Sequence, residues 1–191
     1  MSDKYCRNHV HEEVSQTVSQ DFQLQQRIRA GDNGAFAELY AEHKHKVYSY
    51  CSLFLGHRGG VEDVFQDVFI AMLERIRDGQ EIDCLGAYLM RSSRNRCLNI
   101  LRDAKFTIDI NSAVETLVEP GIEDEDRKVQ LRGAVQTLPD DQREVVILHD
   151  YHGYTYDEIA ALTELPISTV RKRLFRARTH LREMLNPGPK K

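Results

Sequence analysis

The sequence predicts an all-α fold of two small helical domains, a helical bundle and a C-terminal helix-turn-helix domain, joined by an acidic flexible linker. Two observations carry this prediction. Apolar residues recur at helical spacing on both sides of an acidic stretch that lacks such spacing. No alternation typical of strands competes with that pattern. The predicted parts are an N-terminal extension (1–20), a first domain (21–103), a linker (104–126) and a second domain (127–187).

Three amphipathic segments, at residues 34–56, 61–76 and 85–105, build the predicted first domain. In each segment apolar residues return every three or four positions and mark one helix face. Glycines between the segments predict turns. These glycines are Gly31, Gly59, Gly60 and Gly79. Helices joined by such short turns predict a bundle.

The predicted linker is strongly acidic. Residues 103–126 hold one lysine against eight acidic residues, and Pro120 and Gly121 interrupt any helix there. A stretch of this composition without an amphipathic stripe is typical of a flexible tether. An ordered loop capped by a short helix is the alternative interpretation.

Helical patterning resumes in the second domain. The run Leu138-Pro139-Asp140 is predicted to end one helix and start another, with the proline in the first turn of the second helix, where it is tolerated. A short helix is predicted at 156–163, followed by a turn at Pro166, since proline cannot continue a helix. Ser168 is then expected to cap the last and longest helix. A short helix, a tight turn and a longer helix make a helix-turn-helix.

The last helix has the composition of a DNA reader. Laid out at about 100° per residue, its apolar residues share one side: Val170, Leu174, Ala177 and Leu181. Residues 168–182 contain six lysines and arginines and no acidic residue, whereas a solvated face normally mixes both signs. Residues near the start of such a helix reach base edges, and later cations meet phosphates. The predicted contacts are Arg171, Lys172, Arg173, Phe175, Arg176 and Arg178, with Phe175 against a thymine methyl group or a sugar edge.

The net charge of −4 conceals separate charged blocks. Residues 87–102 hold four arginines and no acidic residue, and residues 127–191 hold twelve basic residues against eight acidic ones. The two blocks lie on opposite sides of the acidic linker. This segregation predicts two separate cationic surfaces.

Composition limits the remaining functions. With 41% hydrophobic and 29% charged residues, no membrane-length apolar run and no signal-like start, the chain is expected to be soluble and cytoplasmic. No nucleophile–base pair, metal cluster or phosphate-binding glycine loop appears, so neither catalysis nor a cofactor is expected. The four cysteines form no CxxC pair and are expected to be reduced, mostly buried thiols. Cys6, His9 and His11 lie close enough to chelate a metal, which leaves a metal sensor as one alternative.

Three stretches resemble one known family. The run LPDDQREVVILHDYHGYTYDEIAALTELPISTVRKRLFRARTHLRE resembles the promoter-recognition domain of bacterial sigma factors of the extracytoplasmic-function (ECF) type. EDVFQDVFIAML resembles the sigma segment that binds the clamp helices of the polymerase β′ subunit. LGAYLMRSSRNRCLNILRDAK resembles the segment that melts and reads the minus-ten promoter element. The resemblance, over about residues 21–103 and 127–185, implies a factor that binds core RNA polymerase at the β′ clamp helices and the β flap and directs initiation at promoter DNA.

The resemblance also assigns residues. It implies that Asp63, Gln66 and Asp67 contact the polymerase, and their spacing puts them on one flank beside Val64, Phe65 and Val68. Helix-on-helix interfaces with a polar rim have this pattern. For the minus-ten element, Tyr88 matches an aromatic position at which tryptophan is common, and Asn95 and Asn99 match polar positions. Arginines would supply the attraction to the DNA backbone. They are Arg91, Arg94, Arg96 and Arg102.

The same resemblance makes the loop Asp78–Gly86 a pocket for a flipped base. Unpairing one base costs only a few kcal/mol, so a pocket that receives the base is physically reasonable. In the C-terminal helix, Ser168 stands where many members have glycine and Lys172 where many have serine. These departures leave the minus-thirty-five sequence open.

Regulation is implied by resemblance as well. The run YCSLFLGHRGGVEDVFQDVFIAML is similar to sigma factors of cobalt–nickel resistance operons, which implies a stress or metal-resistance regulon. ECF factors are usually held by a membrane-anchored anti-sigma factor, so such a partner is implied, without insertion of this chain into the membrane. A conventional regulator that binds operator DNA as a dimer is the other alternative. The upstream helices favour the sigma factor, because a simple repressor does not need them.

Overall fold

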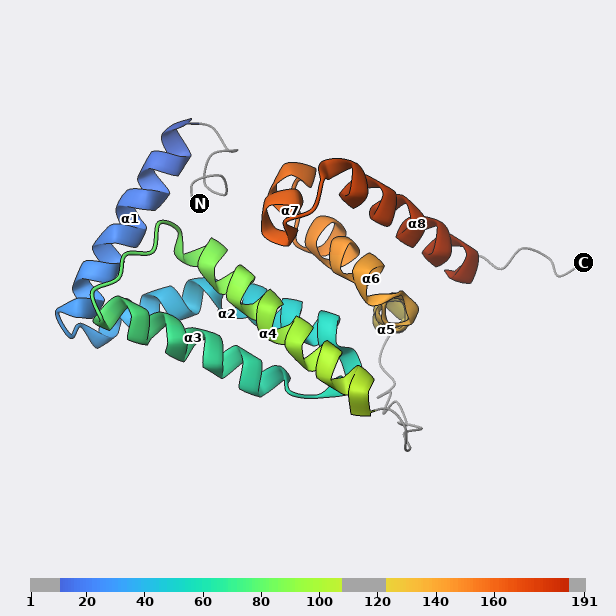
Figure 1. The fold of residues 1–191 in the computed structure, drawn as a ribbon, viewed down its shortest axis with the longest axis horizontal. Helices are drawn as coiled ribbons and strands as arrows, with labels where there is room; N and C mark the ends of the chain where they lie inside the picture. The colour runs from blue at the N-terminus through green and yellow to red at the C-terminus, as the bar shows by residue number, and fades with distance from the viewer. Residues whose placement is uncertain (1–10, 108–122, 186–191) are drawn as a thin grey trace, which may run out of the picture. The chain divides into compact units, whose positions relative to one another are not determined.

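The computed structural model describes residues 11–107 and 123–185, and the regular structure in these ranges is entirely helical (Figure 1). The predicted all-α class is confirmed. The described residues form two compact units. One holds the chain up to Ser52 together with Gly60–Ile100, and the other holds Leu53–Gly59 together with the chain from Leu101. Of the helices in the described ranges, none is long and apolar enough to span a bilayer.

The helices of the first unit follow the predicted amphipathic segments, with one addition. They are α1 (His11–Arg29), α2 (Asn33–Leu55), α3 (Val61–Arg77) and α4 (Leu85–Thr107), and the last residues of α2 and α4 belong to the second unit. A 3₁₀ turn, Gly56–Arg58, follows α2. Gly59 and Gly60 then take φ values of 75° and 78°, a conformation that glycine adopts without a steric cost.

The addition is α1. The predicted boundary at residue 20 falls inside this helix, and α1 packs against α3 as part of the first unit. This helix thus runs across the boundary between the predicted extension and the predicted first domain. Cys6 and His9, two of the three candidate metal ligands, lie outside the described residues, as does the side chain of His11.

The second unit contains α5 (Glu123–Thr137), α6 (Asp140–Val146) with a π-helical continuation (Ile147–Tyr151), α7 (Tyr156–Thr163) and α8 (Ile167–Leu185). Both ends of the predicted linker are helical, since α4 runs to Thr107 and α5 begins at Glu123. The remainder of the predicted linker, 108–122, lies outside the described residues.

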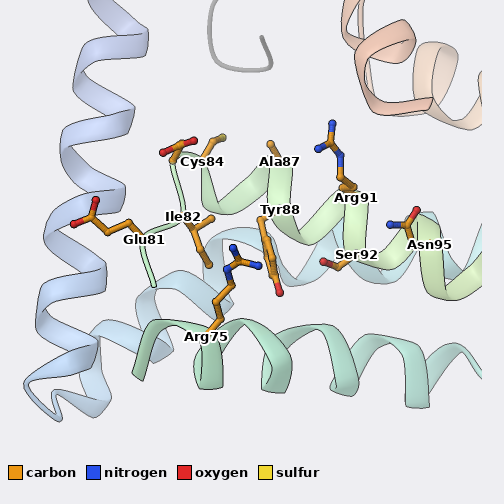
Figure 2. Close-up of a pocket in the computed structure, with 10 residues that line it drawn as sticks. Arg75, Glu81, Ile82, Cys84, Ala87, Tyr88, Arg91, Ser92 and Asn95 are labelled. Atoms are coloured by element: carbon orange, nitrogen blue, oxygen red, sulfur yellow. The ribbon is translucent and has the colours of Figure 1, made fainter. Parts of the chain in front are cut away.

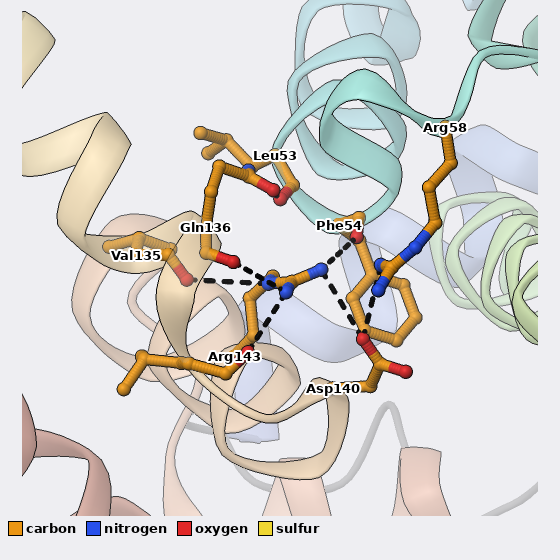
Figure 3. Close-up of polar contacts among 8 residues, drawn as sticks. Leu53, Phe54, Arg58, Val135, Gln136, Asp140 and Arg143 are labelled. Carbon is orange, nitrogen blue, oxygen red and sulfur yellow. Dashed lines mark hydrogen bonds and ion pairs between the residues drawn. The ribbon is translucent and has the colours of Figure 1, made fainter. Parts of the chain in front are cut away.

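Arg143 on α6 is the polar centre of the second unit (Figure 3). Its side chain is 3% exposed. The guanidinium donates hydrogen bonds to the carbonyl oxygens of Phe54 (3.1 Å), Val135 (3.3 Å), Gln136 (2.8 Å) and Leu138 (2.9 Å). The first belongs to the last turn of α2 and the next two to the last turn of α5, where carbonyls lack partners in their own helix. One cation therefore caps two helix C-termini.

The surroundings of Arg143 balance its charge. Asp140 Oδ1 lies 3.4 Å from Arg143 Nη1 and 3.1 Å from Arg58 Nη1. Burial lowers the pKa of the Arg143 guanidinium, and the nearby Asp140 carboxylate opposes that effect. The Gln136 amide adds a further hydrogen bond, 2.7 Å to the carbonyl of Leu53. The end of α2 is thus joined to α5 and α6 by polar contacts that span more than eighty positions of sequence.

The helix-turn-helix is confirmed in α7 and α8. Thr155 and Glu158 form a reciprocal capping box that begins α7 at Tyr156, as the sequence predicts. Glu164 ends α7 with a left-handed φ of 59°. The last helix begins at Ile167, two residues earlier than a cap at Ser168 implies, because the Pro166 carbonyl accepts from the N–H groups of Thr169 and Val170. Ser168 therefore lies inside the first turn of α8 and is not its cap.

Candidate functional site

α8 divides into a buried face and a basic face. Val170, Leu174, Ala177 and Leu181 are between 0% and 9% exposed, which confirms the predicted core face. The other side of the helix carries the predicted DNA contacts, of which Arg171, Lys172, Phe175, Arg176 and Arg178 are exposed and Arg173 is half-buried. Phe175 is 73% exposed. The exposed side of α8 thus presents one large apolar side chain among cations.

Neighbouring groups hold some of these cations in place. Arg173 Nε lies 3.2 Å from Asp141 Oδ2. Arg178 pairs through two nitrogens with the Asp150 carboxylate, and this hydrogen bonding raises the pKa of its guanidinium. The Arg171 guanidinium lies 5.4 Å from the centre of the Tyr156 ring. Acids and an aromatic ring of the second unit therefore orient the basic face of α8 and offset part of its charge.

The predicted polymerase contacts share one exposed side of α3. Asp63, Gln66 and Asp67 are all exposed, and Ile70, 53% exposed, continues the same side one turn later. The apolar neighbours expected from the sequence are placed differently. Val64 and Val68 are 3% and 0% exposed, so they belong to the core and cannot contact a partner.

Phe65 is half-buried, and its ring packs against other aromatic rings of the first unit. Its ring lies 5.8 Å from Tyr40, 5.5 Å from Tyr48 and 5.2 Å from Phe69, measured between centroids. Aromatic rings in this arrangement stabilise one another edge to face. The exposed flank of α3 thus combines polar groups with Ile70 as its apolar contact.

The predicted minus-ten residues lie mainly on one face of α4. Tyr88, Arg91, Asn95, Asn99 and Arg102 follow at intervals of three and four, so they share a side of the helix at about 100° per residue. Arg94 lies on the flank of this face, and Arg96 pairs with Asp67 of α3 at 2.6 Å. Arg102 lies near the acid that follows it, 3.8 Å from Asp103 Oδ1.

A pocket of about 420 Å³ opens beside the first turns of α4 (Figure 2). Its lining comes from the end of α3, the loop before α4, and α4 itself: Arg75, Glu81, Ile82, Asp83, Cys84, Ala87, Tyr88, Arg91, Ser92 and Asn95. The structure therefore brings together three of the seven residues predicted for the minus-ten element with the predicted loop. The Arg75 guanidinium lies 5.5 Å from the centre of the Tyr88 ring, which holds the ring by a cation–π contact.

The sequence prediction missed two residues of α1 that bear on this pocket. The Gln25 side-chain amide accepts from the N–H of Ile82 and donates to its carbonyl, both at 2.9 Å. Asp21 Oδ2 accepts from the N–H of Leu85, the first residue of α4, at 2.8 Å. Burial raises the pKa of the Asp21 carboxyl to about 6; the Leu85 N–H lowers it and the charge of Glu42 raises it further. The sequence signal for these two residues was their spacing of four positions, whereas their burial is visible in the structure.

Comparison with protein families gives two matches. Residues 39–107 match the Sigma-70 region 2 family, and residues 128–181 match Sigma-70, region 4. Together the two matches cover well over half of the chain. The first includes the exposed flank of α3 and the whole of α4, and the second includes the helix-turn-helix.

Relatives match over most of the chain. It is 28% identical over 191 residues to the RNA polymerase sigma-H factor of Pseudomonas aeruginosa, and the alignment covers 90% of this chain and 96% of the relative. It is 29% identical over 180 residues to the ECF RNA polymerase sigma-E factor of Escherichia coli K12, with 86% and 93% covered.

Solved structures share the fold. CnrH in complex with the cytosolic domain of CnrY superposes with a TM-score of 0.62 at 23% identity, over 88% of this chain and 98% of the other. The sigma factor RpoE in complex with the anti-sigma factor NepR from Bartonella quintana gives 0.61 at 24% identity, over 79% and 96%.

Proposed function

Because this chain belongs to the ECF type of the sigma-70 family of RNA polymerase sigma factors, we propose a role for each surface described above. As a sigma factor it binds core RNA polymerase and promoter DNA and directs transcription initiation, and it is not an enzyme. Its work is done by binding energy alone.

The pocket beside Tyr88 is proposed to receive a base flipped from the non-template strand of the minus-ten element. The observation that carries this assignment is the pocket itself, whose volume of about 420 Å³ is lined by an aromatic ring, an arginine and an asparagine on one helix face. A flipped base needs an aromatic surface for stacking and polar groups for its edge. Tyr88 supplies the first, and Arg91 and Asn95 supply the second. Arg94, Asn99 and Arg102 are proposed to follow the DNA backbone along α4.

α8 is proposed to enter the major groove of the minus-thirty-five element. Support comes from its exposed basic face, which carries no acidic residue between positions 168 and 182. Arg171, Lys172 and Arg173 lie nearest the start of the helix and are the proposed base contacts. Arg176 and Arg178 are proposed to meet phosphates, and the exposed Phe175 to meet a thymine methyl group or a sugar edge.

The exposed side of α3 is proposed to bind the β′ clamp helices of the polymerase through Asp63, Gln66 and Asp67, with Ile70 as the apolar contact. The second unit is proposed to contact the β flap. Binding to polymerase and to the chromosome requires a cytoplasmic protein, and we propose that location.

Regulation by a membrane-anchored anti-sigma factor is proposed in addition. The second unit offers a groove of about 490 Å³ whose apolar lining includes Leu131, Val146 and Tyr151. Such a groove suits the apolar face of a partner helix. The similarity of residues 50–73 to sigma factors of cobalt–nickel resistance operons supports a stress or metal-resistance regulon. Transcript levels in cells with and without this chain, exposed to cobalt, nickel or zinc, test the regulon directly.

Binding of fork-junction DNA by the holoenzyme tests the pocket. Tyr88→Ala should weaken binding about tenfold or more, because stacking of one base on an aromatic ring contributes about 1–3 kcal/mol. Tyr88→Phe keeps the ring and should bind like the wild type. Tyr48→Ala removes an exposed tyrosine of the same unit outside the pocket and serves as the matched control. Equal binding by all three variants would exclude the pocket as the base site.

A further inference from the structure

One side of α1 is lined with polar residues that bind the loop before α4. Asp21, Gln25 and Arg29 follow one another at intervals of four, so they lie on the same side of the helix. Each of them makes hydrogen bonds to the main chain between residues 76 and 85. Their partners are backbone groups, so these contacts fix the path of the loop rather than the position of one side chain.

The contacts are spread along the whole loop. Arg29 holds its start, with Nε 3.0 Å from the carbonyl oxygen of Ile76 and Nη2 2.9 Å from that of Gln80. Gln25 holds its middle by pairing with both backbone groups of Ile82. Asp21 holds its end at the N–H of Leu85, one of the N–H groups that a helix cannot satisfy internally.

Burial makes the contacts of Asp21 and Gln25 costly to lose, whereas Arg29 is half-buried. Asp21, Gln25 and Ile82 are 6%, 3% and 7% exposed, so water cannot readily replace a lost partner. The loop has no regular secondary structure of its own between Arg77 and Leu85. Three bonds from α1 hold backbone groups of the loop itself, at Gln80 and Ile82. Two more hold the flanking helix ends, at Ile76 of α3 and Leu85 of α4.

The same loop forms one wall of the pocket. Ile82, whose backbone Gln25 holds, lines the pocket together with its neighbours Glu81, Asp83 and Cys84 (Figure 2). The wall lies beside Tyr88 and Arg91 of α4, the helix whose first N–H is held by Asp21. A shift in the loop backbone would change the shape of the pocket.

We propose that Asp21, Gln25 and Arg29 are positioning residues for base selection: the polar side of α1 holds the loop in the conformation that fits the captured base. The proposal rests on the assignment of the pocket as the base site. It adds a helix that lies ahead of the matched family region, residues 39–107, to the parts of the molecule that determine promoter preference. The three residues act through the loop and need no contact with DNA.

The test measures base capture by the wild-type holoenzyme on fork-junction DNA in which each single-stranded non-template position in turn is made abasic. The position at which loss of the base weakens binding most is the captured base. Gln25→Leu keeps a buried apolar stem but removes both bonds to Ile82, and it should reduce that abasic penalty about tenfold. Affinity for core polymerase should stay at the wild-type level, because α3 is unchanged. Gln26→Leu, at an exposed neighbouring position, is the matched control.

A second pair of variants covers the case in which Gln25→Leu does not fold. Asp21→Asn keeps an oxygen that accepts from Leu85 and should retain the abasic penalty, whereas Asp21→Ala should reduce it. A merely structural role would lower the melting temperature of the variants without changing the abasic penalty, and that result would overturn the proposal. If the wild type itself shows no abasic penalty, the pocket is not the base site, and the proposed function fails before the role of α1 is tested.

Discussion

Asp67 Oδ2 on α3 lies 2.6 Å from Arg96 Nη1 on α4, so an ion pair joins the proposed polymerase-binding side to the arginine-rich helix. The two side chains are 53% and 40% exposed. Exposed pairs of this kind contribute between about 0 and 1 kcal/mol to stability. The pair is therefore weak enough for Asp67 to exchange its partner for a polymerase side chain.

The exchange can be tested with single substitutions. Arg96→Ala should change the free energy of unfolding by less than about 1 kcal/mol and leave the affinity for core polymerase unchanged. Asp67→Ala should have an equally small effect on stability but weaken core binding. Titration of labelled sigma factor with core enzyme measures both affinities. Equal loss of core affinity in the two variants would show that the pair itself, rather than Asp67, forms the contact.

The buried carboxyl of Asp21 predicts a pH dependence of stability. Its pKa in the folded protein is about 6, compared with the ordinary 3.8, mainly because of burial. The folded state thus holds this proton more tightly than the unfolded state, so the contribution is fully present below pH 3.8 and is lost as the pH rises through 6. The nearby charge of Glu42 acts in the same direction.

Asp21→Asn isolates this effect, since every other titrating group is common to both proteins. The variant should become more stable than the wild type as the pH rises from 4 to 7.5, by at most about 3 kcal/mol for a shift of about two pH units. Urea unfolding at a series of pH values measures the difference. A wild type that gains stability over the variant across this range would mean that the Asp21 charge is stabilised and that its pKa is lowered.

Cys84 offers a chemical block of the pocket. It is half-buried and lines the pocket, whereas Cys51 and Cys97 are buried at 0% exposure. Alkylation with N-ethylmaleimide should therefore modify Cys84 before the buried pair and should abolish base capture by filling the pocket. Fork-junction DNA bound to the holoenzyme should slow the modification. Cys84→Ser should keep base capture after treatment, and loss of capture in that variant would assign the effect to another thiol.

Replacing Arg143 is expected to lower the free energy of unfolding strongly. Arg143→Met keeps the apolar stem but leaves the carbonyls of two helix ends buried without a donor. Removing one partner of such a buried charged network costs about 3 kcal/mol or more. Denaturant unfolding measures the loss, with Arg132→Met, at an exposed position on α5, as the control. A change as small as that of the control would show that water replaces the guanidinium.

Much of this fold could be predicted from sequence because its helices bury apolar residues at regular spacing. α2, α3, α4, α7 and the buried side of α8 follow from that pattern alone. α1 was missed because Asp21 and Gln25 occupy buried positions that the pattern reserves for apolar residues. Their partners are backbone groups some sixty positions away, and spacing within one helix carries no information about such contacts.

The positions of the candidate site residues could be predicted from sequence only in part. Helical spacing places Tyr88, Arg91 and Asn95 on one side of α4, so their convergence on one pocket follows from position. Spacing places Val64 and Val68 on the apolar face, next to the polar flank of Asp63, Gln66 and Asp67. It does not decide whether that edge of the face packs inside the unit, as it does here, or against a partner. Nor could it show that Arg178 and Asp150 pair, since their contact depends on how α8 packs.

Run-off transcription with purified core polymerase on a panel of promoters tests the central claim most directly. The wild type should give promoter-dependent transcripts, whereas Asp63→Lys should lose them through polymerase binding and Arg176→Ala through minus-thirty-five binding. Glu38→Lys, which changes an exposed acid paired with Arg27 at the surface, should transcribe like the wild type. Transcripts that survive both Asp63→Lys and Arg176→Ala would contradict the assigned surfaces. Tight binding to operator DNA without polymerase, together with no transcription, would contradict the account of this protein as a promoter-directing factor.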